Sequence, residues 1–238
     1  MRSRVYLAAM QQYLAGLNDP QKEAVLHVNG PLMIVAGAGS GKTKVLTTRI
    51  AHLMSVGVDA FNILALTFTN KAAREMKKRI AEIVGNNEAK NLWMGTFHSV
   101  FAKILRVEAE KIGYPSNFTI YDTDDSKSLI RTILREMQLD DKLYAANVVY
   151  NRISSAKNNL ISHTEYLEND QLQAEDAGNK RPLLGVIYET YAKRCYKAGA
   201  MDFDDLIGLP VKLFSEYPEI VEKWQNRLRY LLVDEYQD

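Results

Sequence analysis

The chain has 238 residues, a net charge of +1 and a single cysteine. Hydrophobic residues make up 47% of the sequence and charged residues 25%, which is ordinary for a globular protein with a substantial core. The low net charge gives no argument for bulk attraction to nucleic acid, so any such function must depend on local sites. One cysteine excludes an internal disulfide and suits a reducing cytoplasm, and no apolar run approaches the length of a membrane span.

Both ends of the sequence carry information. Residues 1–9 contain two arginines but no secretory signal, and we interpret them as an extension, with Met10 as an alternative start. At the other end, an apolar strand runs directly into a cluster of acids over residues 231–238. Domains seldom stop on a central strand that carries functional residues, so we expect a sequence that is incomplete at its C-terminus.

Residues 17–25 predict the start of a helix. Asn18 or Asp19 would be its N-cap, and Pro20 lies in the first turn, where its missing N–H costs no hydrogen bond. Gln21 carries a donor and an acceptor, which suits the edge of an adenine. Taken alone, Gln21 would be interpreted as a solvated helix residue.

The next segment has the pattern of a strand, a glycine loop and a helix. The apolar residues 32–35 predict a buried parallel strand, and residues 45–54 have helical spacing. Between them lie Gly37, Gly39 and Gly41. Such a loop points backbone N–H groups at an anion, so we predict a phosphate-binding loop with Lys42 on the phosphates and the Thr43 hydroxyl on Mg²⁺. The alternative is a turn that binds nothing, and Ala36 stands where the strict pattern has its first glycine.

Two further buried strands are predicted at residues 63–67 and 92–95. The residues that directly follow these strands are Phe68, Thr69, Asn70, Thr96, Phe97 and His98. Ligands of open α/β sheets bind at the carboxyl edge, and aromatic rings beside small hydroxyls suit stacking on single-stranded nucleic acid. Phe68 could instead belong to the core. His98 has no partners at metal-ligand spacing, so we do not expect a metal site there.

A helix is predicted at residues 71–84, with Ala72, Met76, Ile80, Ile83 and Val84 as its apolar stripe. Five of the nine residues from 71 to 79 are basic, which is usually only a solvated face.

The hydrophobic pattern of the sequence changes near residue 116. Asp122 is a predicted N-cap, and helical patterns without strand alternation indicate an all-helical insertion.

The sheet resumes at residues 230–233, which Asp234 and Glu235 follow. Successive side chains of a strand face opposite ways, so these adjacent carboxylates cannot share one task. The simplest assignment is that one of the two acids binds Mg²⁺ and the other is oriented towards an attacking water. The alternative, an acid pair on the surface, is disfavoured by the apolar strand before it.

These segments resemble, in this order, the Q-motif, motifs I, Ia and Ib, an Asp-Phe-Asp-Asp-Leu segment and motif II of UvrD/Rep/PcrA helicases of superfamily one. They lie at residues 17–25, 36–43, 64–76, 95–99, 202–206 and 231–238. The resemblance covers roughly residues 10–238. It implies an α/β fold of the P-loop NTPase (RecA-like) type, with a parallel sheet flanked by helices. It also implies ATP and Mg²⁺ as cofactors, and single-stranded and partly duplex DNA as partners.

The resemblance assigns a role to each matching residue. Gln21 would recognise adenine, and nucleotide binding would involve Ala38, Gly39, Ser40, Gly41, Lys42, Thr43 and Lys44. Lys44 stands where the family often has an arginine that stacks on adenine. Thr43 and Asp234 would hold Mg²⁺, Glu235 would activate water and Gln237 would sense the γ-phosphate. Phe68, Thr69, Asn70, Thr96, Phe97 and His98 would lie along the single strand, and Lys157 with Asn158 would touch duplex DNA.

The implied organisation is a RecA-like ATP-binding domain at residues 10–117, a helical subdomain at 118–198, and the domain's continuation at 199–238. The missing C-terminal RecA-like domain would supply arginines typically worth about 10³–10⁵ in turnover, so we expect slow hydrolysis. The favoured function is a 3′-to-5′ ATP-dependent DNA helicase. The alternatives are a nucleotide-dependent single-stranded DNA-binding module without motor activity and a small-molecule P-loop kinase, which residues 21 and 234–238 disfavour.

Overall fold

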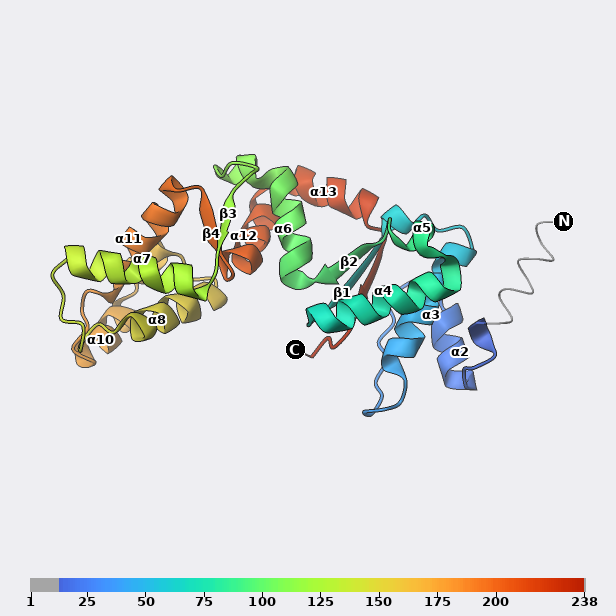
Figure 1. Cartoon of the computed structure of the whole chain (residues 1–238). Coiled ribbons are helices and arrows are strands. Elements are labelled where there is room, and N and C mark those ends of the chain that lie inside the picture. The colour runs from blue at the N-terminus through green and yellow to red at the C-terminus, as the bar shows by residue number, and fades with distance from the viewer. Residues whose placement is uncertain (1–12, 238) are drawn as a thin grey trace. The chain divides into compact units, whose positions relative to one another are not determined.

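The computed structural model describes residues 13–237 (Figure 1). The predicted extension at residues 1–9 lies outside the described residues. The chain divides into two compact units. The described part of the first unit consists of residues 13–100 and 219–237, and the second unit consists of residues 101–218.

The first unit contains a parallel sheet of three strands in the order β2-β1-β5. These strands are β1 (Ile63–Thr67), β2 (Trp93–Thr96) and β5 (Tyr230–Val233), at or within one residue of the predicted positions. Every residue of β1 is buried, which explains its uninterrupted apolar sequence. The register pairs Thr67 with Thr96 and Leu66 with Val233, so all three strands end at one edge.

Helices surround this sheet in the first unit. They are α2 (Asp19–Leu26), α3 (Lys42–Ser55), α4 (Asn70–Val84) and α5 (Asn86–Ala89), and the short 3₁₀ helix η1 (Ala60–Asn62) precedes β1. Helix α6 (Phe97–Glu108) begins in this unit, and α13 (Pro218–Arg227) leads into β5. The shared core contains Ile50, Leu53, Ile63, Ala65, Met76, Ile80 and Leu232. Helices α3 and α4 therefore pack against the sheet through their apolar faces.

The predicted stripe of α4 is confirmed at Met76, Ile80 and Val84 and wrong at Ile83. Met76 and Ile80 are fully buried, whereas Ile83 is 39% exposed. The neighbouring Val84 still packs against the core, so in the last turn Ile83 lies on the side of the helix that the core does not cover.

The predicted strand at residues 32–35 is wrong. This segment has no regular secondary structure, and Met33 and Val35 are 75% and 89% exposed. A strand forms only when a neighbour satisfies its backbone N–H and C=O groups. Within the described residues, β1 pairs with β2 and β5, and no strand pairs with residues 32–35. Apolar composition alone therefore leaves the segment an exposed loop before α3.

The second unit is mainly helical. Its helices are α7 (Thr123–Glu136), α8 (Ala146–Asn158), α9 (His163–Glu168), α10 (Asp170–Gly178), α11 (Leu184–Lys197) and α12 (Asp205–Glu216), with the 3₁₀ helix η2 (Ala109–Ile112). Its largest core cluster includes Ile130, Ile133, Val149, Ile153, Tyr166, Ile187, Tyr188 and Tyr191. The predicted cap of α7 is confirmed, because the Asp122 side chain accepts hydrogen bonds from the N–H groups of Asp124 and Asp125.

The expectation of an all-helical insertion is corrected by a second, two-stranded parallel sheet. Strand β3 (Thr119–Tyr121) pairs with β4 (Ala200–Asp202) inside the second unit. Three-residue strands carry too little alternation for a sequence pattern to reveal them. The predicted boundaries at 118 and 198 also differ from the division at 101 and 218. Among residues 13–237, no helix is both long and apolar enough to span a membrane.

Candidate nucleotide and nucleic-acid site

The glycine loop requires glycine at two positions. Gly39 and Gly41 have φ values of 75° and 86°, in the left-handed region that side chains disfavour. A Cβ atom on Gly41 would also lie 3.1 Å from the Nε2 atom of Gln21. Gly41 is the N-cap of α3, and no side chain caps this helix. The first turn of α3 therefore keeps backbone N–H groups and positive potential for an anion.

The Lys42 side chain lies along its own loop. Its ammonium Nζ donates hydrogen bonds to the carbonyl oxygens of Ala36 at 3.0 Å and Gly37 at 3.3 Å. Both carbonyls belong to the exposed segment before α3. A bound phosphate would compete with these neutral acceptors for the ammonium charge, and charge-assisted hydrogen bonds are the stronger ones.

Gln21 joins the start of α2 to the glycine loop. Asn18 is the N-cap, which decides the choice left open by the sequence, and its side chain accepts a hydrogen bond from the Gln21 N–H. In return, Gln21 Oε1 accepts from the Asn18 N–H at 3.1 Å. Gln21 Nε2 donates to the Ser40 carbonyl at 2.9 Å. Lys44 makes a comparable bridge, since its Nζ donates to the Gly16 carbonyl at 2.6 Å.

The acids after β5 differ in environment. The Asp234 backbone N–H continues the ladder to the Leu66 carbonyl at 2.9 Å, and the Asp234 residue is only 8% exposed. Glu235 is exposed, has a positive φ of 55° and accepts a hydrogen bond from Gln237 Nε2 at 2.6 Å. One acid is thus buried and the other faces solvent, because the chain turns away from the strand direction at Glu235 directly after β5.

The pKa of Asp234 links the acids to the glycine loop. Burial and the neighbouring Glu235 carboxylate raise the pKa of Asp234 above its usual value, while the positive charge of Lys42 acts in the opposite direction. The Lys42 ammonium is therefore close enough to Asp234 to affect its ionisation. A buried carboxylate near a lysine and the N-terminus of a helix suits a metal-bound phosphate chain.

The residues predicted to contact nucleic acid lie at the same edge of the sheet but differ in accessibility. Phe68 is 63% exposed directly after β1, so the alternative that it belongs to the core is wrong. Thr69 caps α4 by accepting from the Ala72 N–H at 3.1 Å, and Asn70 is the exposed first residue of that helix.

After β2 the pattern is different. Thr96 is buried, and its Oγ1 accepts from the Ser99 N–H at 3.3 Å, so its side chain supports the start of α6. Ser99 Oγ donates to the Thr96 carbonyl at 2.9 Å. Phe97 is half-buried and His98 is exposed at the first turn of α6. At this edge Phe68, Thr69, Asn70 and His98 are thus exposed, whereas Thr96 is buried and Phe97 half-buried.

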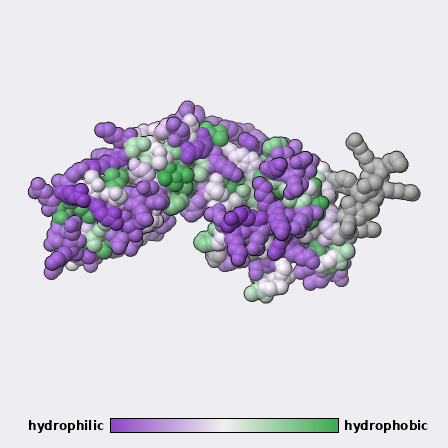
Figure 2. Space-filling model, in the orientation of Figure 1, coloured by the Kyte–Doolittle hydropathy of each residue, from purple (hydrophilic) through white to green (hydrophobic). Residues whose placement is uncertain are grey.

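A shallow groove of about 470 Å³ runs beside these residues. Its lining residues are Asn70, Ala73, Arg74, Lys77, Met94, Gly95 and Ser99. The exposed basic residues of α4 contribute to the hydrophilic surface over that helix in Figure 2. The sequence indicated a basic run without singling out Arg74 and Lys77. Their spacing of three residues, which places them on one helix face, was the available signal.

Lys157, predicted to touch duplex DNA, has a largely buried side chain. Its ammonium Nζ forms ion pairs with Asp202 at 2.7 Å and Asp205 at 2.8 Å, and its side chain is only 9% exposed. The expectation that Lys157 touches duplex DNA is therefore wrong, because two buried carboxylates already hold the charge. Asn158, the next residue, is exposed.

The first unit thus defines an α/β protein that combines a parallel sheet, a glycine loop at a helix N-terminus and an acid pair at one sheet edge. The chain belongs to the UvrD/REP helicase N-terminal domain family, which matches residues 17–238.

Named relatives agree with this membership. The chain is 46% identical over 233 residues to the ATP-dependent DNA helicase UvrD1 of Mycobacterium leprae, covering 96% of this chain and 29% of the relative. It is 46% identical over 228 residues to the ATP-dependent DNA helicase PcrA of Bacillus subtilis, covering 95% of this chain and 30% of the relative. PcrA of Staphylococcus aureus is 43% identical over 230 residues, with 96% and 30% covered. The chain therefore spans less than a third of the length of these relatives.

Proposed function

We propose that this chain is the ATP-binding portion of a DNA helicase that moves 3′ to 5′ along single-stranded DNA. The observation that carries the proposal is the grouping of Lys42, Asp234 and the exposed Phe68 around one edge of a parallel sheet. The names of the relatives, ATP-dependent DNA helicases, support it. The polarity follows from the resemblance to UvrD/Rep/PcrA enzymes. A cytoplasmic location, suggested by the single buried Cys195, belongs to the same proposal.

In this proposal the glycine loop binds the phosphates of ATP. The N–H groups of residues 38–44 surround the phosphate chain, Lys42 provides the positive charge, and Gln21 contacts adenine. The Thr43 hydroxyl and the Asp234 carboxylate are oxygen ligands of the kind that Mg²⁺ prefers, so these residues fit the ion. Mg²⁺ would neutralise charge on the phosphates during transfer. Glu235 orients the attacking water, and Gln237 senses the γ-phosphate.

The DNA half of the site extends from the same edge. Phe68 stacks on a base, which needs no sequence preference and therefore suits a protein that moves along DNA. Thr69, Asn70, Thr96, Phe97 and His98 follow the strand, with the buried Thr96 acting through the start of α6. Arg74 and Lys77 are positioned to meet the DNA backbone phosphates along α4.

The ATP site and the DNA site are coupled in this proposal because residues of both follow neighbouring strands of one sheet. The nucleotide-facing acid follows β5 and the base-facing Phe68 follows β1, and these strands are paired. The proposed domain arrangement is residues 10–117 and 199–238 as a RecA-like domain interrupted by residues 118–198. A second RecA-like domain would complete the ATP site and the DNA track, as in the family that the sequence resembles.

Binding of a fluorescent single-stranded oligonucleotide to the 238-residue chain, with and without ATP·Mg²⁺, tests this function. We expect binding to the single strand that responds to nucleotide. A P-loop kinase for small molecules would not bind the oligonucleotide. A second assay measures strand displacement from 3′-tailed and 5′-tailed duplexes. It uses a protein in which this chain is extended to the full length of the relatives. Displacement separates a helicase from a DNA-binding module without motor activity.

A further inference from the structure

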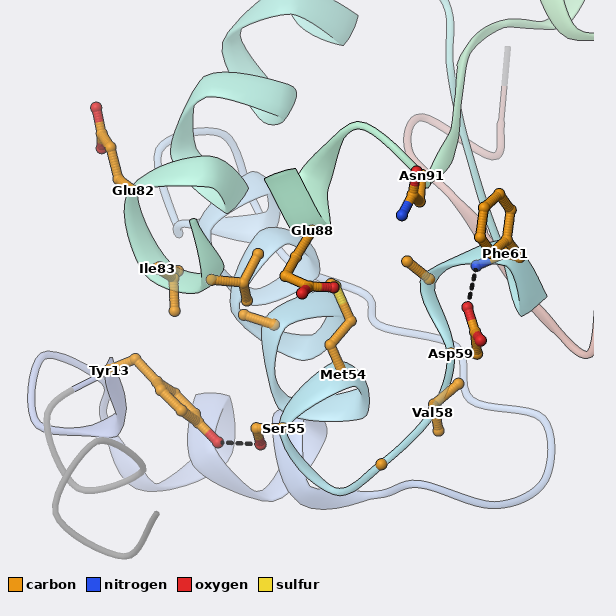
Figure 3. Close-up of a pocket in the computed structure, with 14 residues that line it drawn as sticks. Tyr13, Met54, Ser55, Val58, Asp59, Phe61, Glu82, Ile83, Glu88 and Asn91 are labelled. Carbon is orange, nitrogen blue, oxygen red and sulfur yellow. Dashed lines mark hydrogen bonds between the residues drawn. The ribbon is translucent and has the colours of Figure 1, made fainter. Parts of the chain in front are cut away.

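A second pocket lies in the first unit, at the end of β1 opposite to the candidate site. It has a volume of about 880 Å³ and fourteen lining residues, including Ala60 and Phe61 of η1, which immediately precedes β1 (Figure 3). Four parts of the chain form its walls: Tyr13, the end of α3, the segment through η1, and the region from the end of α4 to residue 91. The proposed ATP and DNA contacts follow the carboxyl ends of the strands, so this pocket has no part in them.

The lining combines apolar side chains with negative charge. The apolar contributors are Met54, Val58, Phe61, Ile83 and Val84. Its charged residues are Asp59, Glu82 and Glu88, and no lysine, arginine or histidine is among the fourteen. Figure 3 draws the Glu88 carboxylate among the lining side chains and Asp59 beside Phe61, whereas the Glu82 carboxylate lies at the outer edge and points away from the other drawn residues. A ligand for this surface needs positive charge and an apolar body.

Hydrogen bonds hold the walls in place. The Tyr13 hydroxyl lies 2.9 Å from Ser55 Oγ and 3.0 Å from His52 Nδ1, which fixes the side formed by α3. Asp59 accepts a hydrogen bond from the Phe61 N–H at 2.9 Å, which orders the turn into η1. Phe61 and Ile83 nevertheless remain 48% and 39% exposed. The pocket is therefore pre-formed and presents apolar surface to a partner at little cost in ordering.

We propose that this pocket docks a peptide segment of a partner protein in which arginine or lysine alternates with apolar side chains. Charge complementarity selects this occupant. Three carboxylates, with no basic side chain among the fourteen lining residues, repel nucleotides and nucleic acid, and they attract a guanidinium or ammonium group. The apolar side chains of the same segment would cover Met54, Phe61 and Ile83, where burial of apolar surface supplies affinity.

The test uses a fluorescein-labelled peptide with the repeat Arg-Leu-Arg-Leu and the 238-residue chain, measured by fluorescence anisotropy at low and high salt. We expect saturable binding that weakens with salt. The double substitution Glu82→Gln and Glu88→Gln should weaken binding about tenfold, equivalent to about 1.4 kcal/mol. Ile83→Ser should weaken it as well. Peptides with glutamate for arginine, or serine for leucine, should bind poorly.

Glu75→Gln is the matched control, because Glu75 is an exposed acid of α4 that does not line the pocket. It should leave peptide affinity unchanged, and circular dichroism melting should show that all variants fold. Equal affinity of the double variant and the native chain would overturn the proposal. Peptide binding only after removal of residues 1–12 would also overturn it, because the chain itself would then be the occupant.

Discussion

The side-chain amide of Gln21 connects two segments that are both required for the candidate nucleotide site. Its Nε2 donates to the Ser40 carbonyl at 2.9 Å, while its Oε1 accepts from the Asn18 N–H at 3.1 Å. One planar group thus closes the N-terminus of α2 and holds the glycine loop. The second N–H of Gln21 Nε2 and the second lone pair of Oε1 remain available, so Gln21 can contact an adenine as proposed while keeping both hydrogen bonds.

Gln21→Glu should keep the cap of α2 and lose the donor to Ser40. We expect affinity for both ATP and inorganic triphosphate to fall about tenfold, since a tenfold change corresponds to about 1.4 kcal/mol, the size of a good hydrogen bond. Isothermal titration calorimetry measures both. Gln21→Met, which adds no charge, should act in the same direction, and Glu23→Gln on the same helix should change nothing. Unchanged triphosphate affinity would show that the bond to the loop does not matter for phosphate binding.

Lys42→Ala should abolish stabilisation by nucleotide. A ligand at 100 times its Kd adds about 2.7 kcal/mol to the stability of the protein that binds it, so ATP·Mg²⁺ should raise the Tm of the native chain. Without the ammonium group, the phosphates lose their positive partner and the rise should disappear. Differential scanning fluorimetry provides the measurement, and Lys90→Ala, an exposed lysine after α5, is the control. A full Tm rise in Lys42→Ala would contradict the site.

Phe68→Ala should weaken single-stranded DNA binding by about 1–3 kcal/mol, because a base loses its stacking partner. The stability of the protein should stay within about 1 kcal/mol, in contrast to the 3–5 kcal/mol lost when a core phenylalanine is truncated. Phe61→Ala is a close control, because Phe61 is also a partly exposed phenylalanine but precedes β1. Equal loss of DNA affinity in both variants would argue against a specific contact at Phe68.

Lys157→Met should destabilise the protein by about 3–5 kcal/mol near pH 8, because it leaves the largely buried carboxylates of Asp202 and Asp205 without their positive partner. Lys193→Met removes only the exposed pair with Glu189 and should cost about 0.5 kcal/mol or less. Urea unfolding followed by circular dichroism compares the two. A loss in Lys157→Met no larger than in the control would refute the importance of this network.

The pH dependence of the same variant gives an independent test. Burial, opposed by Lys157, raises the pKa of Asp205 to about 6, so its stabilising contribution is present at low pH and is lost as pH rises through about 6. Burial would also raise the pKa of Asp202, but Lys157 holds it below its usual value, so its contribution is lost as pH falls. In Lys157→Met both pKa values should rise. Its stability should therefore increase from pH 8 to pH 5 relative to the native chain.

Local sequence patterns determined elements of both units. The apolar run of β1, the stripe of α4 and the cap of α7 depend on residues close together in the chain, so their positions were predictable. The placement of Asp234 beyond a strand and of Phe68 at a strand end followed from the same patterns. These predictions succeed because side-chain periodicity and capping are properties of short segments.

Only the tertiary structure determined the features that depend on contacts between segments distant in the sequence. Residues 32–35 have the composition of a strand but lack a strand neighbour, and Lys157 looks like a surface lysine until Asp202 and Asp205 come beside it. The bond from Gln21 to Ser40 and the pairing of β3 with β4 likewise join segments far apart in the chain. Backbone pairing and the burial of a charge are settled only when a partner is in place, and the partner's position is a property of the whole fold.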